Sequence, residues 1–278
     1  MSLTKWAAVH LNNNPYQAII IMKIKNIIAV LALTLMSSSI MAQNAHFTVN
    51  GTIEYEKTIN MWAIMKKRIN KQNESYMQPV YDQYRKSQPQ FKKLTSTLNF
   101  ADNKTMYTPK PDDGPQNFWG AVMVAQNNTT ASDLGSETSV IQKKVYEETF
   151  LLKDSIRNIK WKITDETREI AGFPCRRANA VIMDSIYVVA FYTEDIAVSG
   201  GPENFSGLPG MILGVALPHE NITWFATKVT DVAIPPAKLT APTKGKSVTN
   251  KQLRATLDEA MKDWGEYAKD EYKAFMLE

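Results

Sequence analysis

The clearest strand pattern of the chain is residues 175–192, CRRANAVIMDSIYVVAFY. In its first half, Ala178, Ala180 and Ile182 alternate with other residue types, including Arg177 and Asn179. Apolar residues with a period of two are typical of a strand with one buried face. The turn signal Asp184-Ser185 then leads into a second apolar run. Because so short a link joins neighbouring strands, this stretch predicts an antiparallel pair.

The same pattern extends in both directions along the chain. It predicts an α+β, β-rich fold with an antiparallel meander, and leaves open a curved or half-barrel form of the sheet. The other strands that we expect are Phe47–Glu56, Thr95–Phe100, Lys104–Thr108, Lys143–Leu152, Lys160–Asp165, Arg168–Ala171, Met211–Leu217 and Ile222–Thr230.

Two amphipathic helices and two irregular segments complete the pattern. Apolar residues four apart predict a helix from Met61 to Tyr84, after the first strand, with a break at Pro79. Residues 109–138 are rich in Pro, Gly, Asn and Ser and predict a long loop. Residues 234–248 predict a Pro/Lys linker, and residues 249–278 predict a C-terminal amphipathic helix.

Composition excludes several classes of protein. The chain has 278 residues, 32 Lys+Arg against 28 Asp+Glu, and a single cysteine. So small a net charge argues against nucleic acid as a partner. One cysteine can form neither an internal disulfide nor a cysteine metal cluster.

The N-terminus has the pattern of a secretory signal peptide. A basic start at Met22 is followed by an apolar run from Ile27 to Met36 and by a small-residue cleavage region ending at Ala42. We therefore interpret residues 22–42 as a signal peptide and residues 1–21 as a mis-called N-terminal extension. The rival interpretation is a retained anchor, although the run is shorter than the roughly 20 residues that span a bilayer.

The expected location follows from this leader. We expect export to the periplasm or the outside of a bacterial cell, with a peripheral position on the outer membrane left open. No later segment has about 18 uninterrupted apolar residues, so the mature chain is expected to lack a transmembrane segment.

Catalytic motifs are mostly absent. The sequence has no Walker loop, no dinucleotide fingerprint and no G-x-S-x-G elbow. His219-Glu220 begins like a zinc-protease motif, but Thr223 occupies the position of the second histidine. Cys175 lies in a strand pattern, which favours an inert thiol over a nucleophile paired with a histidine. We predict no catalytic residue, no metal ligand and no cofactor.

Residues 199–213, SGGPENFSGLPGMIL, stand apart from the strands. Pro209-Gly210 suits the centre of a type II turn, and Gly200-Gly201-Pro202 makes a second sharp bend. The structural interpretation is a rigid corner before the next strand. The functional interpretation is a preorganised rim that meets a ligand or partner, formed by Gly200, Gly201, Pro202, Phe205, Gly207, Leu208, Pro209 and Gly210.

The motif Gly207-Leu208-Pro209-Gly210-Met211-Ile212 resembles the signature of the GLPGLI family, which are exported bacterial proteins of undetermined function. The similarity is most specific from Trp161 to Leu213, and we assign residues 43–233 to a GLPGLI-like, β-rich domain. Met211 replaces the family's Leu, and Phe191 stands where the family usually has Trp. The resemblance implies export and a β-rich fold, and it transfers no catalytic residue.

Three functions are compatible with these patterns. The first is a non-catalytic envelope protein that binds a small apolar ligand or an envelope protein through a curved sheet and the Gly/Pro rim. The second is a hydrolase or redox enzyme that uses His219, Cys175 or carboxylates brought together by folding. The third is an assembly or docking protein that uses the C-terminal helix.

Overall fold

The computed structural model describes residues 22–28, 48–112 and 128–277. The chain divides into two units, residues 1–46 and 47–278. In the first unit residues 22–28 are helical, while residues 1–21 and 29–42 of the expected extension and leader lie outside the described part. Among the helices of the described residues, none has the length and apolar character to cross a membrane.

The second unit is built on one open sheet of 12 strands, in the order β12-β6-β5-β4-β3-β2-β1-β11-β10-β9-β8-β7. All neighbours pair antiparallel except β12 and β6. The β-rich, antiparallel α+β fold predicted above is therefore confirmed. The strands are β1 (Gly51–Asn60), β2 (Phe91–Ala101), β3 (Lys104–Pro109), β4 (Thr129–Asp133), β5 (Thr138–Val145), β6 (Glu148–Ser155), β7 (Lys162–Ile170), β8 (Phe173–Ile182), β9 (Ile186–Thr193), β10 (Met211–Leu217), β11 (Ile222–Thr230) and β12 (Lys246–Val248).

Two meanders make up this sheet. Strands β1 to β6 follow one another in space as in sequence, and so do β7 to β11. Antiparallel pairing of β1 with β11 joins the two meanders into one sheet. The turn between β2 and β3 has Asp102 and Asn103 at φ 49° and 57°, as a tight hairpin turn requires. Short turns thus account for most of the strand order.

Three predicted segments differ from the structure. The single strand expected at residues 143–152 is the hairpin of β5 and β6, which reverses at Tyr146 with φ 53°. The expected loop at residues 109–138 contains the strand β4. Its polar sequence TTASD has no strand pattern of its own, and β4 forms because it pairs with β3 and β5. Residues 160–165 and 168–171 contribute to one strand, β7, which has an irregularity between Ile163 and Thr167.

The helical hairpin after β1 breaks at a different place from the one expected. Helix α2 (Met61–Lys67) and helix α3 (Glu74–Ser87) are separated by residues 68–73, and α3 continues through Pro79. The Asn73 amide donates to the Arg68 carbonyl oxygen at 2.9 Å and accepts from the Asn70 N–H at 2.8 Å. Such side-chain to backbone bonds compete with helix and favour a turn.

The C-terminal segment forms two helices, not one. Helix α5 (Asn250–Ala260) begins at a capping box between Thr249 and Gln252, where the C-terminal helix was expected to start, and helix α6 (Glu266–Leu277) follows Gly265 at φ 56°. A left-handed residue of this kind ends a helix and redirects the chain. The expected linker before α5 contains the short helix η2 (Pro236–Leu239) and β12, so part of it belongs to the sheet.

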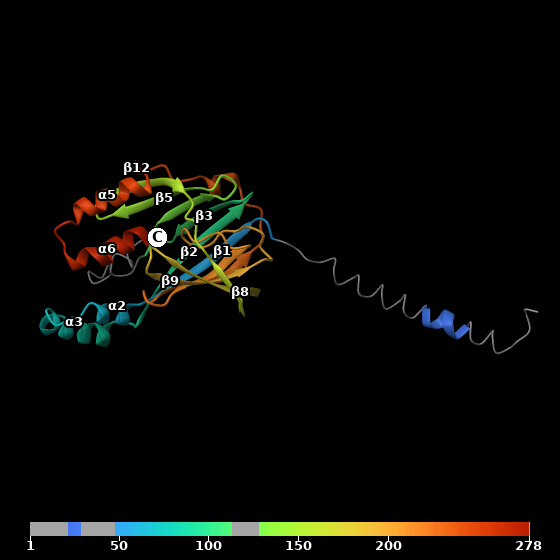
Figure 1. Cartoon of the computed structure of the whole chain (residues 1–278), viewed down its shortest axis with the longest axis horizontal. Helices are drawn as coiled ribbons and strands as arrows, with labels where there is room; N and C mark the ends of the chain where they lie inside the picture. Colours follow the sequence, from blue (N-terminus) through green and yellow to red (C-terminus); the bar gives the residue numbers. More distant parts are fainter. Residues whose placement is uncertain (1–21, 29–47, 113–127, 278) are drawn as a thin grey trace, which may run out of the picture. The chain divides into compact units, whose positions relative to one another are not determined.

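Buried apolar side chains form three clusters on this scaffold. One lies between the sheet and the helices α2 and α6 and includes Ile64, Trp224 and Leu277. A second contains Tyr55, whose hydroxyl donates to the Ile212 carbonyl oxygen at 2.6 Å. A third packs α5 and α6 against β5 and β6, and Figure 1 shows α5 beside β5. The four helices α2, α3, α5 and α6 gather on one side of the sheet (Figure 1).

Candidate functional site

The Gly/Pro segment before β10 is a packed corner. The Gly207 N–H donates to the Ser199 carbonyl oxygen at 3.2 Å, and the Ile212 N–H donates to the Gly200 carbonyl oxygen at 2.8 Å. The indole of Trp161 donates to the Ser206 carbonyl oxygen at 2.9 Å. These bonds close the loop on itself and give it the rigidity expected from its glycines and prolines.

Most of the eight predicted rim residues are buried in this corner. Phe205 and Leu208 pack in the first apolar cluster, and only Gly207 and Pro209 of the eight are exposed. A ligand could reach those two residues alone without displacing the others. The role of this rim in binding stays a prediction.

Cys175 and His219 are not brought together. Arg176, next to Cys175, pairs with Tyr192 near the end of β9, whereas the His219 ring lies 6.4 Å from the Tyr187 ring near its beginning. At about 3.3 Å per residue, these points are roughly 17 Å apart along the strand. Burial also raises the pKa of the Cys175 thiol to about 12, so little thiolate is available there at neutral pH.

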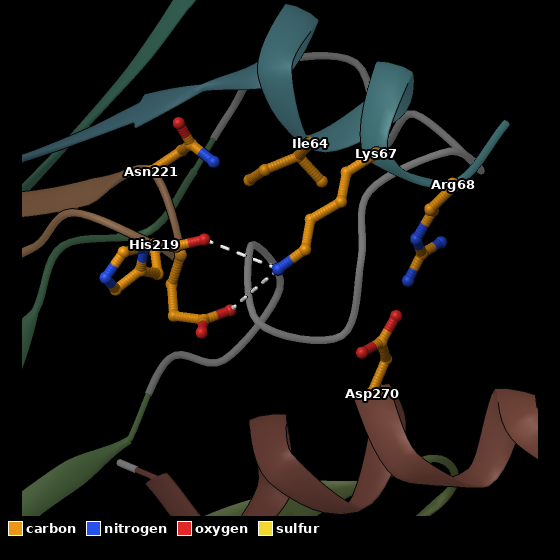
Figure 2. A pocket seen from close by; sticks show the side chains of 7 residues that line it. Ile64, Lys67, Arg68, His219, Asn221 and Asp270 are labelled. Carbon is orange, nitrogen blue, oxygen red and sulfur yellow. Dashed lines mark hydrogen bonds and ion pairs between the residues drawn. The ribbon is translucent and has the colours of Figure 1, made fainter. Parts of the chain in front are cut away.

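His219 lies instead at a charged pocket where three elements meet: α2, the turn between β10 and β11, and α6. The Lys67 ammonium lies 3.4 Å from the His219 carbonyl oxygen and 3.8 Å from the Glu220 carboxylate. Figure 2 shows the Lys67 side chain extending from α2 toward the turn that carries His219. Lys273 of α6 forms a second ion pair with Glu220. The Glu220 side chain is only 8% exposed, so two cations balance a buried carboxylate.

Beside this pocket lies an open groove of about 840 Å³, which we call the interhelical groove. It shares Lys67, Arg68 and Asp270 with the pocket, and Figure 2 shows Arg68 of the α2 side pointing toward Asp270 of α6. Its volume is within the range of small-molecule sites. The groove is lined by Lys67, Arg68, Asn70, Gln72, Asn73, Tyr76, Met77, Asp263, Trp264, Gly265, Lys269, Asp270 and Glu271.

Two exposed aromatic rings belong to the lining of this groove. Tyr76, in the first turn of α3, is 59% exposed, and Trp264, just before α6, is 43% exposed. The Trp264 ring contacts the Tyr146 ring, with centroids 5.7 Å apart. This contact holds Trp264 in place while it remains accessible from the groove.

Glu271 is a carboxyl group of the groove whose pKa is shifted. Burial raises its pKa above the ordinary value, and the positive charge of Arg68, with its Nη2 3.6 Å from Oε1, opposes that change. The pKa of Tyr146 is raised to about 12 by burial and by its interaction with Glu271. Strongly perturbed groups often mark functional sites, although structural ion pairs perturb pKa values as well.

A smaller groove of about 340 Å³ lies between α5 and α6. It is lined by apolar Leu257, Met261, Ala268 and Tyr272 and by the charged residues Asp258 and Lys269. Aromatic residues of the C-terminal segment pack in the third cluster: Phe275 is buried there and Tyr272 is partly buried. The docking role expected for this segment stays a prediction.

Sequence patterns did not reveal the interhelical groove. Its residues come from the turn between α2 and α3 and from the turn before α6, which lie almost 200 residues apart. In the sequence, the spacing of Trp264 places it on the apolar face of one continuous C-terminal helix, where it would be buried. The polar run Asn70-Lys71-Gln72-Asn73 was the available signal, because amides in sequence favour a turn and not the helix expected there.

Comparison with protein-family models gives a match over a short segment of the chain. Residues 180–214 match the family model described as "Protein of unknown function (Porph_ging)". This segment runs from β8 into β10 and contains the whole Gly/Pro corner. The match gives no activity, and the GLPGLI assignment itself stays a prediction. A search of curated proteins found no match.

Solved structures with a similar course of the chain are distant. PNGF-II in the P21 space group has 15% identity and a TM-score of 0.47, with 74% of this chain and 33% of that chain covered. PNGF-II in the C2 space group has 14% identity and a TM-score of 0.45, with 81% and 33% covered. This chain thus spans about a third of the length of PNGF-II.

An uncharacterised conserved protein from Thermus thermophilus is also similar. It has 5% identity and a TM-score of 0.36, with 77% of this chain and 99% of that chain covered. Similarity at these levels carries no functional inference.

Proposed function

We propose that the protein is an exported, non-catalytic binding protein of the bacterial envelope that holds its ligand in the interhelical groove. The observation that carries this proposal is the open groove of about 840 Å³ with two exposed aromatic rings in its lining. A concave surface that combines exposed aromatic rings with a few polar side chains is the usual form of a small-molecule site. The export component is supported by the leader pattern of residues 22–42.

The lining presents both polar groups and apolar surface, which favours a ligand that has both. Amide, carboxylate and ammonium groups outnumber apolar side chains around the groove. A ligand that buried these groups without hydrogen-bonding to them would lose affinity, because each unpaired buried polar group costs about 1–3 kcal/mol. The groove therefore suits a ligand with many polar groups and some apolar surface for the rings.

The absence of catalysis is proposed from the arrangement of candidate groups. The thiol of Cys175 and the ring of His219 are far apart, and the Glu220 carboxylate is already engaged by Lys67 and Lys273. These two ion pairs join α2 and α6 to the turn that carries Glu220, which gives this carboxylate a structural role.

The test is a binding screen on the mature chain from Gln43, followed by calorimetry. The probes are a mixture of neutral hexasaccharides, a mixture of hexapeptides and palmitate, each incubated with the wild type and with the double variant Tyr76→Ala/Trp264→Ala. We expect one polar class to bind the wild type, to lose affinity in the double variant and to be recovered chemically unchanged. Three results would each refute the proposal: binding of palmitate alone, equal binding to the wild type and the double variant, or cleavage of a probe.

A matched control guards against an indirect effect of the two substitutions. Phe91 on β2 is 47% exposed, much like Trp264, and does not line the groove. Phe91→Ala should leave binding unchanged. The export component is checked separately by sequencing the N-terminus of secreted protein, where Gln43 is expected and Met22 would contradict it.

A further inference from the structure

We infer that the ligand of the interhelical groove is a neutral oligosaccharide whose sugar rings stack on Tyr76 and Trp264. This inference rests on the proposed function and adds the chemical class of the ligand. Three properties of the groove carry it: its exposed rings, its mixture of hydrogen-bond donors and acceptors, and its balanced charge.

The aromatic rings suit the apolar face of a sugar. Tyr76 and Trp264 are 59% and 43% exposed and come from opposite sides of the groove, from α3 and from the turn before α6. An aromatic face carries the negative part of the ring quadrupole and attracts polarised C–H groups, which a pyranose presents on its faces. Because Trp264 is already held against Tyr146, stacking a sugar on it orders little additional side chain.

The polar groups suit hydroxyls. A sugar hydroxyl both donates and accepts, so a site for several of them needs donors and acceptors together. Gln72 supplies an amide with both functions, and Asp263 supplies a carboxylate acceptor. Among residues 48–112 and 128–277, the side chains of Gln72 and Asp263 have no hydrogen-bond partner. Both are therefore available to a ligand.

The charge balance argues for a ligand without net charge. Three cationic residues, Lys67, Arg68 and Lys269, line the groove together with three acidic ones, Asp263, Asp270 and Glu271. Arg68 lies within ion-pair distance of Glu271, and Lys67 within that of Glu220. A site for a polyanion shows an excess of unpaired cations, which creates the long-range attraction that this groove lacks.

The experiment is titration calorimetry with four neutral hexasaccharides, namely cellohexaose, chitohexaose, maltohexaose and xylohexaose. We expect at least one to bind and to shift the tryptophan fluorescence toward the blue as Trp264 leaves water. Trp264→Ala should weaken binding about tenfold, and Trp264→Phe should weaken it less because a ring remains. Gln72→Ala should weaken it about fivefold through the lost hydrogen bond.

Two controls separate this mode of binding from others. Phe91→Ala should bind like the wild type, because Phe91 lies outside the groove. Raising the salt concentration from about 50 to 500 mM should change the affinity of a neutral ligand by less than about twofold.

The possible failures are distinct from those of the proposed function. If hexapeptides bind in the groove and none of the four sugars does, the ligand class is wrong while the binding function stands. Sugar binding that Trp264→Ala leaves intact would also overturn the inference, because the site would lie elsewhere. If none of the probes binds the wild type, the proposed function and this inference both fail.

Discussion

The Arg157 guanidinium donates a hydrogen bond from Nη1 to the Leu277 carbonyl oxygen, at 2.9 Å, and so closes the C-terminal end of α6. Its Nη2 donates to the Met276 carbonyl oxygen at 2.6 Å. The ammonium group of Lys143, on β5, donates to the Phe275 carbonyl oxygen. Three successive carbonyls at the negative end of the helix dipole are therefore held by two cations. Burial lowers the pKa of Arg157 to about 10, which leaves it charged at neutral pH. This arrangement positions α6, and with it one wall of the interhelical groove.

Replacing Arg157 should destabilise the protein. Arg157→Ala leaves two buried carbonyls without their donor, and we expect the free energy of unfolding in urea to fall by about 2–4 kcal/mol. Arg157→Lys keeps the charge but loses the two-pronged geometry, so its loss should be smaller. Equal unfolding curves for Arg157→Ala and the wild type would contradict this role.

The ion pair of Lys273 with Glu220 should contribute far more than an exposed pair. Lys273→Met removes one of two cations from a carboxylate that is 8% exposed, and about 2–4 kcal/mol of stability should be lost. Lys262→Met is the matched control, because Lys262 pairs with Glu259 in water, at 59% and 75% exposure, and about 0–0.5 kcal/mol is expected there. Urea unfolding of both variants measures the difference, and similar losses would show that the buried pair is not special.

The corner before β10 should tolerate a side chain at Gly207 but not at Gly210. Gly210 has φ 138°, and an added Cβ would lie 2.0 Å from the Thr193 carbonyl oxygen, whereas at Gly207, with φ 90°, the nearest atom would be Trp161 Nε1 at 3.8 Å. We expect Gly210→Ala to cost more than about 4 kcal/mol and Gly207→Ala about 1–2 kcal/mol. Thermal unfolding of the two variants side by side is the measurement, and an equal effect would refute the steric argument.

The carboxyl group of Glu271 should make stability depend on pH. Burial raises its pKa in the folded state, so the folded protein binds more protons than the unfolded chain between the two pKa values. The free energy of unfolding contributed by this group therefore falls as pH rises through that interval. Glu271→Gln removes this contribution and should gain stability relative to the wild type as pH rises through that interval and above it. Urea unfolding of the wild type and of Glu271→Gln at a series of pH values is the measurement, and parallel pH dependences of the two proteins would contradict this role.

The thiol of Cys175 should be unreactive in the folded protein. It is fully buried, and its pKa is about 12, chiefly because of burial. Iodoacetamide at pH 8 should label the native protein about a thousandfold more slowly than the urea-unfolded chain, because alkylation requires the thiolate. Mass spectrometry follows the adduct over time. Rapid labelling of the native protein would revive a nucleophilic role for this residue.

Local patterns predicted the strands well where one face is apolar. The alternation in β8 and β1, the turn at Asp102-Asn103 and the capping box at Thr249 depend on residues close in sequence, so they could be recognised without a structure. The polar strand β4 and the joining of two predicted strands into β7 escaped detection, because neighbouring strands decide them.

The candidate site could not be predicted in this way. Residues 70–76 and 263–271 form the groove only because Arg157 and Lys143 fix α6, and because Lys273 and Lys67 meet at Glu220. None of these contacts has a signature in local sequence.

A β-rich chain of antiparallel strands with a Gly/Pro corner is predictable from local residues, because side-chain periodicity and turn chemistry are local properties. The pairing of β1 with β11, and the groove between two distant helical turns, become visible in the folded protein alone. Those relationships depend on packing and buried charge between segments far apart in the chain, which no single stretch of residues encodes.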